Sequence, residues 1–157
     1  MFTLAVDGRE PFILDPHGRT SHFIWRDPQH VMAWAWHPSF KDRFYLYHDQ
    51  TEHVEAVAPD VMTRNGHNTY VPRTDRAWVL NDTYPDAERR QHIYLYHILT
   101  NRRVTLGRFH LPAEYRGEWR CDTHPSARRD GQAISFDSPH EGTGRQVYVA
   151  DISSIVG

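Results

Sequence analysis

The chain has 157 residues, enough for one domain with a core and too few for two large ones. Hydrophobic residues make up 39% and charged residues 24%, which indicates a folded, soluble protein, and 13% aromatic residues argue against disorder. The formal net charge of -2 provides no basic field, so we predict no nucleic-acid partner.

The single cysteine, Cys121, excludes an intramolecular disulfide. No apolar stretch approaches the ~20 residues that a membrane helix needs. Residues 1–8 lack the basic and apolar regions of a signal peptide. We therefore expect a cytoplasmic protein with no membrane partner.

Short segments rich in aromatic and β-branched residues alternate with turn signals along the chain, as strands do. Residues 2–14 are interpreted as the last two strands of a blade. The further predicted strands, in chain order, cover residues 22–25, 31–36, 43–48, 53–57, 67–70, 77–82, 92–97, 102–106, 124–126, 133–137 and 146–151. Asp130-Gly131 is typical of a hairpin turn, because glycine tolerates positive φ. Residues 155–157 are expected to begin one more strand.

The strands form a repeat. Each copy opens with a histidine at the same place: His22, His67 and His124. The steps between these histidines are 45 and 57 residues, and a four-stranded propeller blade occupies roughly 40–50 residues. An inserted loop, residues 111–119, accounts for the longer step. We predict an all-β fold, a partial β-propeller of about three four-stranded antiparallel blades, with an ordinary antiparallel sandwich as the alternative.

The predicted domain is a single partial propeller over residues 1–157. It consists of a half blade and three blades, at residues 1–19, about 20–62, 63–110 and 120–157. Closed propellers typically have 4–8 blades, so the chain would be part of a ring, either as a split chain or by assembly with other copies. We therefore expect self-association through open blade edges, because unpaired strand edges promote association.

The three repeated histidines are candidate site residues. In a propeller the first strand of each blade lies nearest the axis, so these side chains would face one channel. Imidazole together with carboxylate suits manganese, iron or zinc. The alternative is that each histidine packs at a blade entrance and donates to a backbone carbonyl. Asp82 and Asp137, at the ends of second strands, are interpreted as turn or cap residues, with the alternative that residues 137–141 line the mouth of the channel.

Five stretches carry longer motifs: residues 21–25, 66–67, 81–86, 116–125 and 136–142. Together they resemble the oligogalacturonate lyase family, which is similar to the periplasmic TolB-type propellers. The resemblance covers nearly the whole chain and the C-terminal half of a full-length member. It implies a seven-bladed propeller whose axial site cleaves short pectin fragments by β-elimination, with a histidine base and a manganese ion.

The resemblance also implies roles for single residues. By position, His22 matches the family's catalytic histidine, and His67 and His124 match two histidines that hold manganese. Asp122 falls where the family has a further histidine ligand, and a carboxylate is also a suitable manganese ligand. Trp119 falls where the family has a glutamine ligand, and the family's catalytic arginine would lie just before Met1.

Two arginines precede the third histidine. Arg116 and Arg120 are candidate substrate-binding residues, since a guanidinium group can grip a carboxylate through two parallel hydrogen bonds. For Arg116 a solvated loop charge is the alternative. The predicted function is thus a lyase-like protein that acts on acidic oligosaccharides with Mn²⁺. The alternative is a noncatalytic propeller scaffold or binding module.

Overall fold

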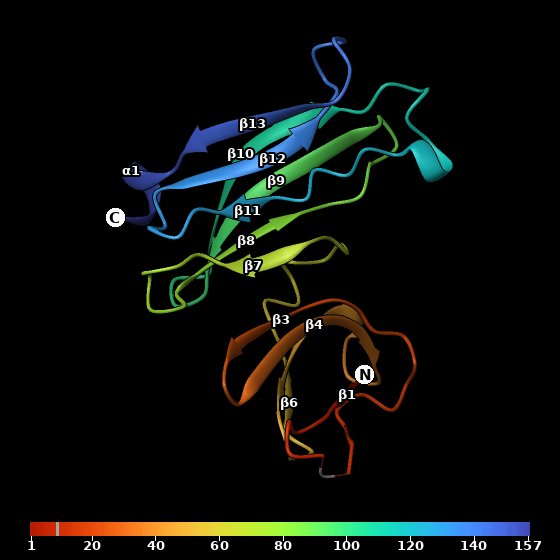
Figure 1. Ribbon diagram of the computed structural model, residues 1–157, viewed down its shortest axis with the longest axis vertical. Helices are drawn as coiled ribbons and strands as arrows, with labels where there is room; N and C mark the ends of the chain where they lie inside the picture. The colour runs from red at the N-terminus through yellow and green to blue at the C-terminus, as the bar shows by residue number, and fades with distance from the viewer. Residues whose placement is uncertain (9) are drawn as a thin grey trace. The chain divides into compact units, whose positions relative to one another are not determined.

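The computed structural model describes residues 1–8 and 10–157 (Figure 1). The chain divides into two compact units, residues 1–65 and residues 66–157, and each is described by itself. The described residues form antiparallel sheets, with a 3-10 turn η1 (Gly117–Trp119) and a four-residue helix α1 (Ser153–Val156). Neither of these helices has the length and apolar character needed to cross a membrane.

Unit 1 holds two sheets. The strands β1 (Phe2–Thr3) and β2 (Phe12–Ile13) form a two-stranded sheet. The second sheet has four strands in sequential order: β3 (Ser21–Asp27), β4 (His30–His37), β5 (Lys41–His48) and β6 (Val54–Ala56). Arg9, which belongs to the predicted half blade, lies outside the described residues.

Unit 2 also holds two sheets. The first has four strands in sequential order: β7 (Asn68–Tyr70), β8 (Trp78–Asp82), β9 (Arg90–His97) and β10 (Arg102–His110). The second has three: β11 (Ser126–Ala127), β12 (Ala133–Ser138) and β13 (Gln146–Asp151). Neighbouring strands pair antiparallel throughout, so the prediction of an all-β antiparallel fold is confirmed.

The core of unit 2 lies between its two sheets. Leu80, Ile93 and Leu95 from β8 and β9 pack in one cluster with Ile134 and Phe136 of β12. All five residues of β8 are buried, whereas β13 alternates between exposed and half-buried positions. A strand that is buried along its whole length can place polar side chains inside the fold, and β8 does so at its last two residues, Asn81 and Asp82.

The predicted turn at Asp130-Gly131 is confirmed. It joins β11 to β12, and Gly131 has a φ of 76°, a value that favours glycine. The Gly131 N–H donates to the Arg128 carbonyl at 2.8 Å. A Cβ at this position would also overlap the carbonyl oxygen of Pro72.

The expected strand at residues 155–157 is wrong, because the chain turns into α1 there. The reason is local. The Asp151 carboxylate accepts hydrogen bonds from the Ser153 N–H at 2.9 Å and the Ser153 hydroxyl at 2.6 Å, which begins a turn. Ile152 is fully buried and anchors the same turn in the core.

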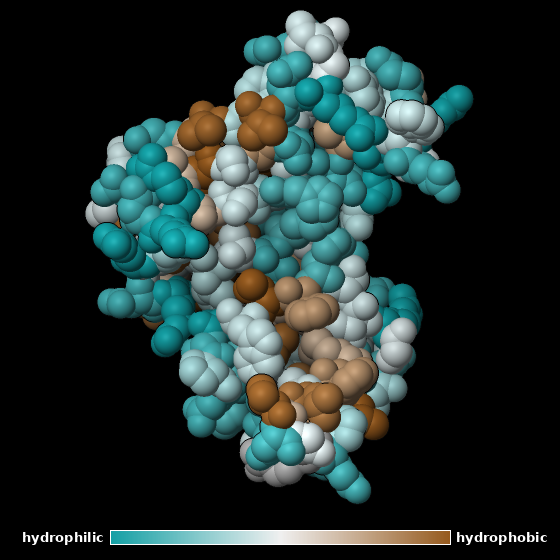
Figure 2. Space-filling view, in the orientation of Figure 1, coloured by the Kyte–Doolittle hydropathy of each residue, from teal (hydrophilic) through white to brown (hydrophobic). Residues whose placement is uncertain are grey.

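Unit 1 contains a cavity of about 780 Å³. Its lining is largely apolar and includes Leu14, Phe23, Trp25 and Val31. Phe23 and Trp25 are exposed although they belong to β3. Figure 2 shows apolar side chains gathered on the surface of this unit.

The packing of unit 2 predicts a contrast between two identical substitutions. Leu95 is fully buried and Leu99 is 83% exposed. Leu95→Ala should lower the free energy of unfolding by about 2–5 kcal/mol because it leaves a cavity, and Leu99→Ala should change it by less than ~0.5 kcal/mol. Chemical denaturation measures both. Equal losses in the two variants would contradict this core.

Candidate metal centre

His67, the residue before β7, is held in place by the end of β8. The His67 carbonyl accepts a hydrogen bond from the Asp82 N–H at 3.2 Å. The His67 N–H donates to Asp82 Oδ1 at 2.6 Å, and the imidazole Nδ1 lies 3.1 Å from Oδ2. An ionised carboxylate can only accept, so Nδ1 carries the proton and Nε2 carries the ring's lone pair.

The segment before β11, residues 122–124, also binds the Asp82 carboxylate. Thr123 is fully buried, and its hydroxyl donates to Asp82 Oδ2 at 2.6 Å. Its carbonyl accepts a hydrogen bond from the Asp137 N–H at 2.8 Å, which ties the segment to β12. Thr123 therefore faces inward, and its two neighbours, Asp122 and His124, are less buried.

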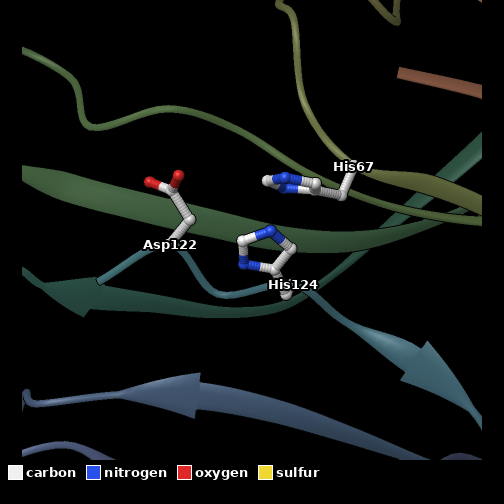
Figure 3. A group of neighbouring side chains, drawn as sticks. All are labelled: His67, Asp122 and His124. Carbon is white, nitrogen blue, oxygen red and sulfur yellow. The ribbon is translucent and has the colours of Figure 1, made fainter. Parts of the chain in front are cut away.

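Two imidazoles and a carboxylate meet in unit 2. One ring nitrogen of His67, one ring nitrogen of His124 and a carboxylate oxygen of Asp122 lie within 4.8 Å of one another. Figure 3 shows the two rings one above the other, with Asp122 beside them; the ring centroids are 3.7 Å apart. Two nitrogens and one oxygen form a donor set that suits manganese, iron or zinc. The three residues fit a divalent first-row metal by their chemistry.

His124 has an unusual backbone conformation. Its φ is 38°, and His22, at the equivalent place in the repeat, has a φ of 43°. Positive φ is uncommon for residues other than glycine and costs about 1–3 kcal/mol when the surroundings impose it. Two histidines at matching places thus share one rare conformation.

Arg120 is paired with the candidate ligand Asp122. Its Nε and Nη2 donate to the two carboxylate oxygens at 2.6 and 2.8 Å, and its guanidinium carbon lies 4.6 Å from the centre of the Tyr84 ring. The hydrogen bonds with Asp122 raise the pKa of Arg120, so the group stays charged. The edge of Arg120 that would grip a substrate carboxylate is therefore engaged by Asp122.

His22 belongs to unit 1, where it lies at a β-bulge in β3. Its Nδ1 lies 2.8 Å from Asn65 Oδ1 and 3.0 Å from the Ser21 hydroxyl. The amide oxygen can only accept, so Nδ1 carries the proton and Nε2 is the basic nitrogen. A histidine in this tautomer is suited to act as a base through Nε2.

The inserted loop contains two residues that the sequence pointed to. Arg116 and Trp119 are exposed; Arg116 precedes η1 and Trp119 ends it. Neither is among the metal-binding group of His67, Asp122 and His124. A role for Arg116 in substrate binding stays a prediction.

Sequence reasoning missed Asp82 and Thr123. Asp82 was interpreted as a turn or cap residue, but its carboxylate bonds to residues 15 and 41 positions away. The sequence does contain an indication of this role, because Asp82 is the one charged residue of β8 and ends it. By contrast, Ser138 beside Asp137 does act locally: its Oγ lies 2.9 Å from Nδ1 of His140.

Comparisons with known proteins bear on the fold. No protein-family model matches the chain, and no curated protein matches it. A solved structure, the crystal structure of TolB from Acinetobacter baumannii, is similar with a TM-score of 0.68 and 19% sequence identity. The match covers 96% of this chain and 34% of the TolB chain. The chain thus has a TolB-like fold and spans about a third of that protein's length.

Proposed function

We propose that this chain is part of a TolB-like β-propeller with a divalent metal site, and that it acts by metal-assisted β-elimination on oligosaccharides of uronic acids. The observation that carries the proposal is the meeting of His67, Asp122 and His124. The similarity to TolB supports the propeller. The resemblance to oligogalacturonate lyases supports the reaction and the choice of Mn²⁺.

Each residue has a role in this reaction. The resemblance to the lyases assigns the role of base to His22, whose Nε2 would take the proton on the carbon next to the substrate carboxylate. The C–O bond at the following carbon then breaks, and a double bond forms between the two carbons. The departing oxygen leaves with a proton from the solvent or from the protonated base. A bound divalent cation would offset the negative charge that grows on the substrate carboxylate.

Arg120 and Asp122 share one ion pair, which connects the metal site to substrate binding. The Asp122 carboxylate has further lone pairs beyond the two that Arg120 engages. It can therefore bind a cation while Arg120 stays close. Arg120 then contributes a fixed positive charge beside the place where an acidic sugar would bind, and Arg116 offers a second, exposed charge.

The second candidate is a noncatalytic binding module, and specific observations favour it. The guanidinium edge of Arg120 is already paired with Asp122. Trp119 stands where the resembled family has a glutamine ligand, and its exposed indole, 74% accessible, is suited to stack on a sugar. In this case the chain would bind an acidic oligosaccharide without cleaving it.

Metal titration tests the site itself. Mn²⁺ and Zn²⁺ are titrated into the protein by calorimetry, with one ion bound per chain expected. His67→Ala and His124→Ala should each weaken binding by more than ~100-fold, because each removes a ligand. His110→Ala, an exposed histidine of the same unit, is the matched control and should bind as the unaltered protein does. Failure to bind either ion at micromolar to millimolar concentration would reject the site.

Activity on digalacturonate separates the two candidates. The enzyme hypothesis predicts an absorbance rise from unsaturated product in the presence of Mn²⁺, reduced by about 10²–10⁴-fold in His22→Ala, which lacks the base. His53→Ala, an exposed histidine of unit 1, should retain the rate. A protein that binds metal and digalacturonate but yields no product would be a binding module.

A further inference from the structure

We propose that Asp82 is the positioning residue of the metal site. Its carboxylate fixes the tautomer of His67 and connects the two segments that carry the three ligands. The inference rests on the proposed metal site. It concerns a residue outside the ligand set, whose carboxylate acts through its neighbours.

The carboxylate of Asp82 is buried and fully engaged. Its side chain is 2% exposed. It accepts hydrogen bonds from the His67 N–H, the His67 Nδ1–H and the Thr123 hydroxyl. Burying a carboxylate is costly unless donors satisfy it, and donors to a charged acceptor bind roughly twice as strongly as donors to a neutral one. The burial of the Asp82 carboxylate is therefore compensated by its donors.

The network spans all three ligands. Asp82 contacts His67 directly, and it contacts Thr123, which stands between Asp122 and His124 in the sequence. The residues on either side of Thr123, Asp122 and His124, are both ligands. The hydrogen bond from the Thr123 hydroxyl to Asp82 therefore helps to place these two ligands relative to His67. Asp82 thus connects the segment at residues 122–124 to His67 through hydrogen bonds, beside the direct contact between the rings of His67 and His124.

The tautomer of His67 follows from the same contact. A neutral imidazole can carry its proton on either nitrogen, and only the nitrogen without a proton can bind a metal. Asp82 accepts from Nδ1–H, so the lone pair is on Nε2. A carboxylate behind a ligating histidine also fixes the orientation of the ring.

Gly66 adds an independent observation. It is buried next to His67, and a Cβ there would overlap the carbonyl oxygen of Asp82 and lie 2.7 Å from its Oδ1. The chain thus has glycine at a place where its backbone lies directly against Asp82. This close approach allows the His67 N–H to reach the carboxylate at 2.6 Å.

The experiment measures metal affinity and the tautomer together. Asp82→Asn should weaken binding of Mn²⁺ and Zn²⁺ by about 10–100-fold, as loss of a partner behind a ligand does. Thr123→Val removes one donor while nearly keeping the shape of the side chain, and should weaken binding by about tenfold; unchanged binding in this variant would count against the inference. This second variant keeps the test decisive if Asp82→Asn does not fold.

Asp86→Asn is the matched control. Asp86 also pairs with a histidine, His92, at 2.9 Å, but His92 is not part of the candidate metal-binding group. Asp86→Asn should leave metal affinity unchanged. A comparable loss in Asp86→Asn would show that Asp82→Asn acts through general stability and would overturn the inference.

A readout without metal distinguishes this inference from the proposed function. Long-range ¹H–¹⁵N spectra of the metal-free protein should show His67 with its proton on Nδ1, and a mixture of tautomers in Asp82→Asn. If the unaltered protein binds metal and folded Asp82→Asn binds it equally well, Asp82 is not a positioning residue and the metal site stands. If the unaltered protein binds no metal, the proposed metal site and the role of Asp82 in it both fail. A His67 that still carries its proton on Nδ1 would then show that the contact with Asp82 is intact and that the three proposed ligands do not bind a cation.

Discussion

The organisation of unit 2 around the candidate site depends on one buried carboxylate. Desolvating a charged group costs several kcal/mol, and each hydrogen bond to it returns about 1.5–3 kcal/mol. Asp82 has donors from the backbone and ring of His67 and from the hydroxyl of Thr123. Together these hydrogen bonds offset the cost of burying the charge. The two histidines and Asp122 take their positions from this network.

Much of the fold could be predicted from the sequence, because strand patterns are local. Aromatic and β-branched segments indicated most strands, and Asp130-Gly131 indicated a hairpin turn that the structure confirms. The end of the chain could not be predicted in this way. There the Asp151 carboxylate binds Ser153 and starts α1, although Ile155 and Val156 suit a strand. A side-chain contact outweighed β-propensity at that place.

The candidate site was predicted in part. The place of histidine in the repeat singled out His67 and His124, which the structure brings together with Asp122. Asp82 was not found, because its role depends on a residue 41 positions away and no local pattern reports such a contact. The pairing of Arg120 with Asp122 also depends on side-chain direction. Sequence spacing alone does not determine that direction.

The fold does not decide the chemistry. A TolB-like fold is shared at 19% identity, and one fold can hold many unrelated functions. What this chain adds is its own set of donors: two imidazoles, one carboxylate, and a charged arginine paired with that carboxylate. The identity of the site therefore depends on whether a cation binds among those donors.

Anomalous diffraction from crystals grown with Mn²⁺ tests this claim most directly. The account predicts one strong peak in unit 2, within coordination distance of a nitrogen of His67, a nitrogen of His124 and an oxygen of Asp122. Crystals that show no peak at these residues, or that show manganese bound only elsewhere on the chain, would contradict it.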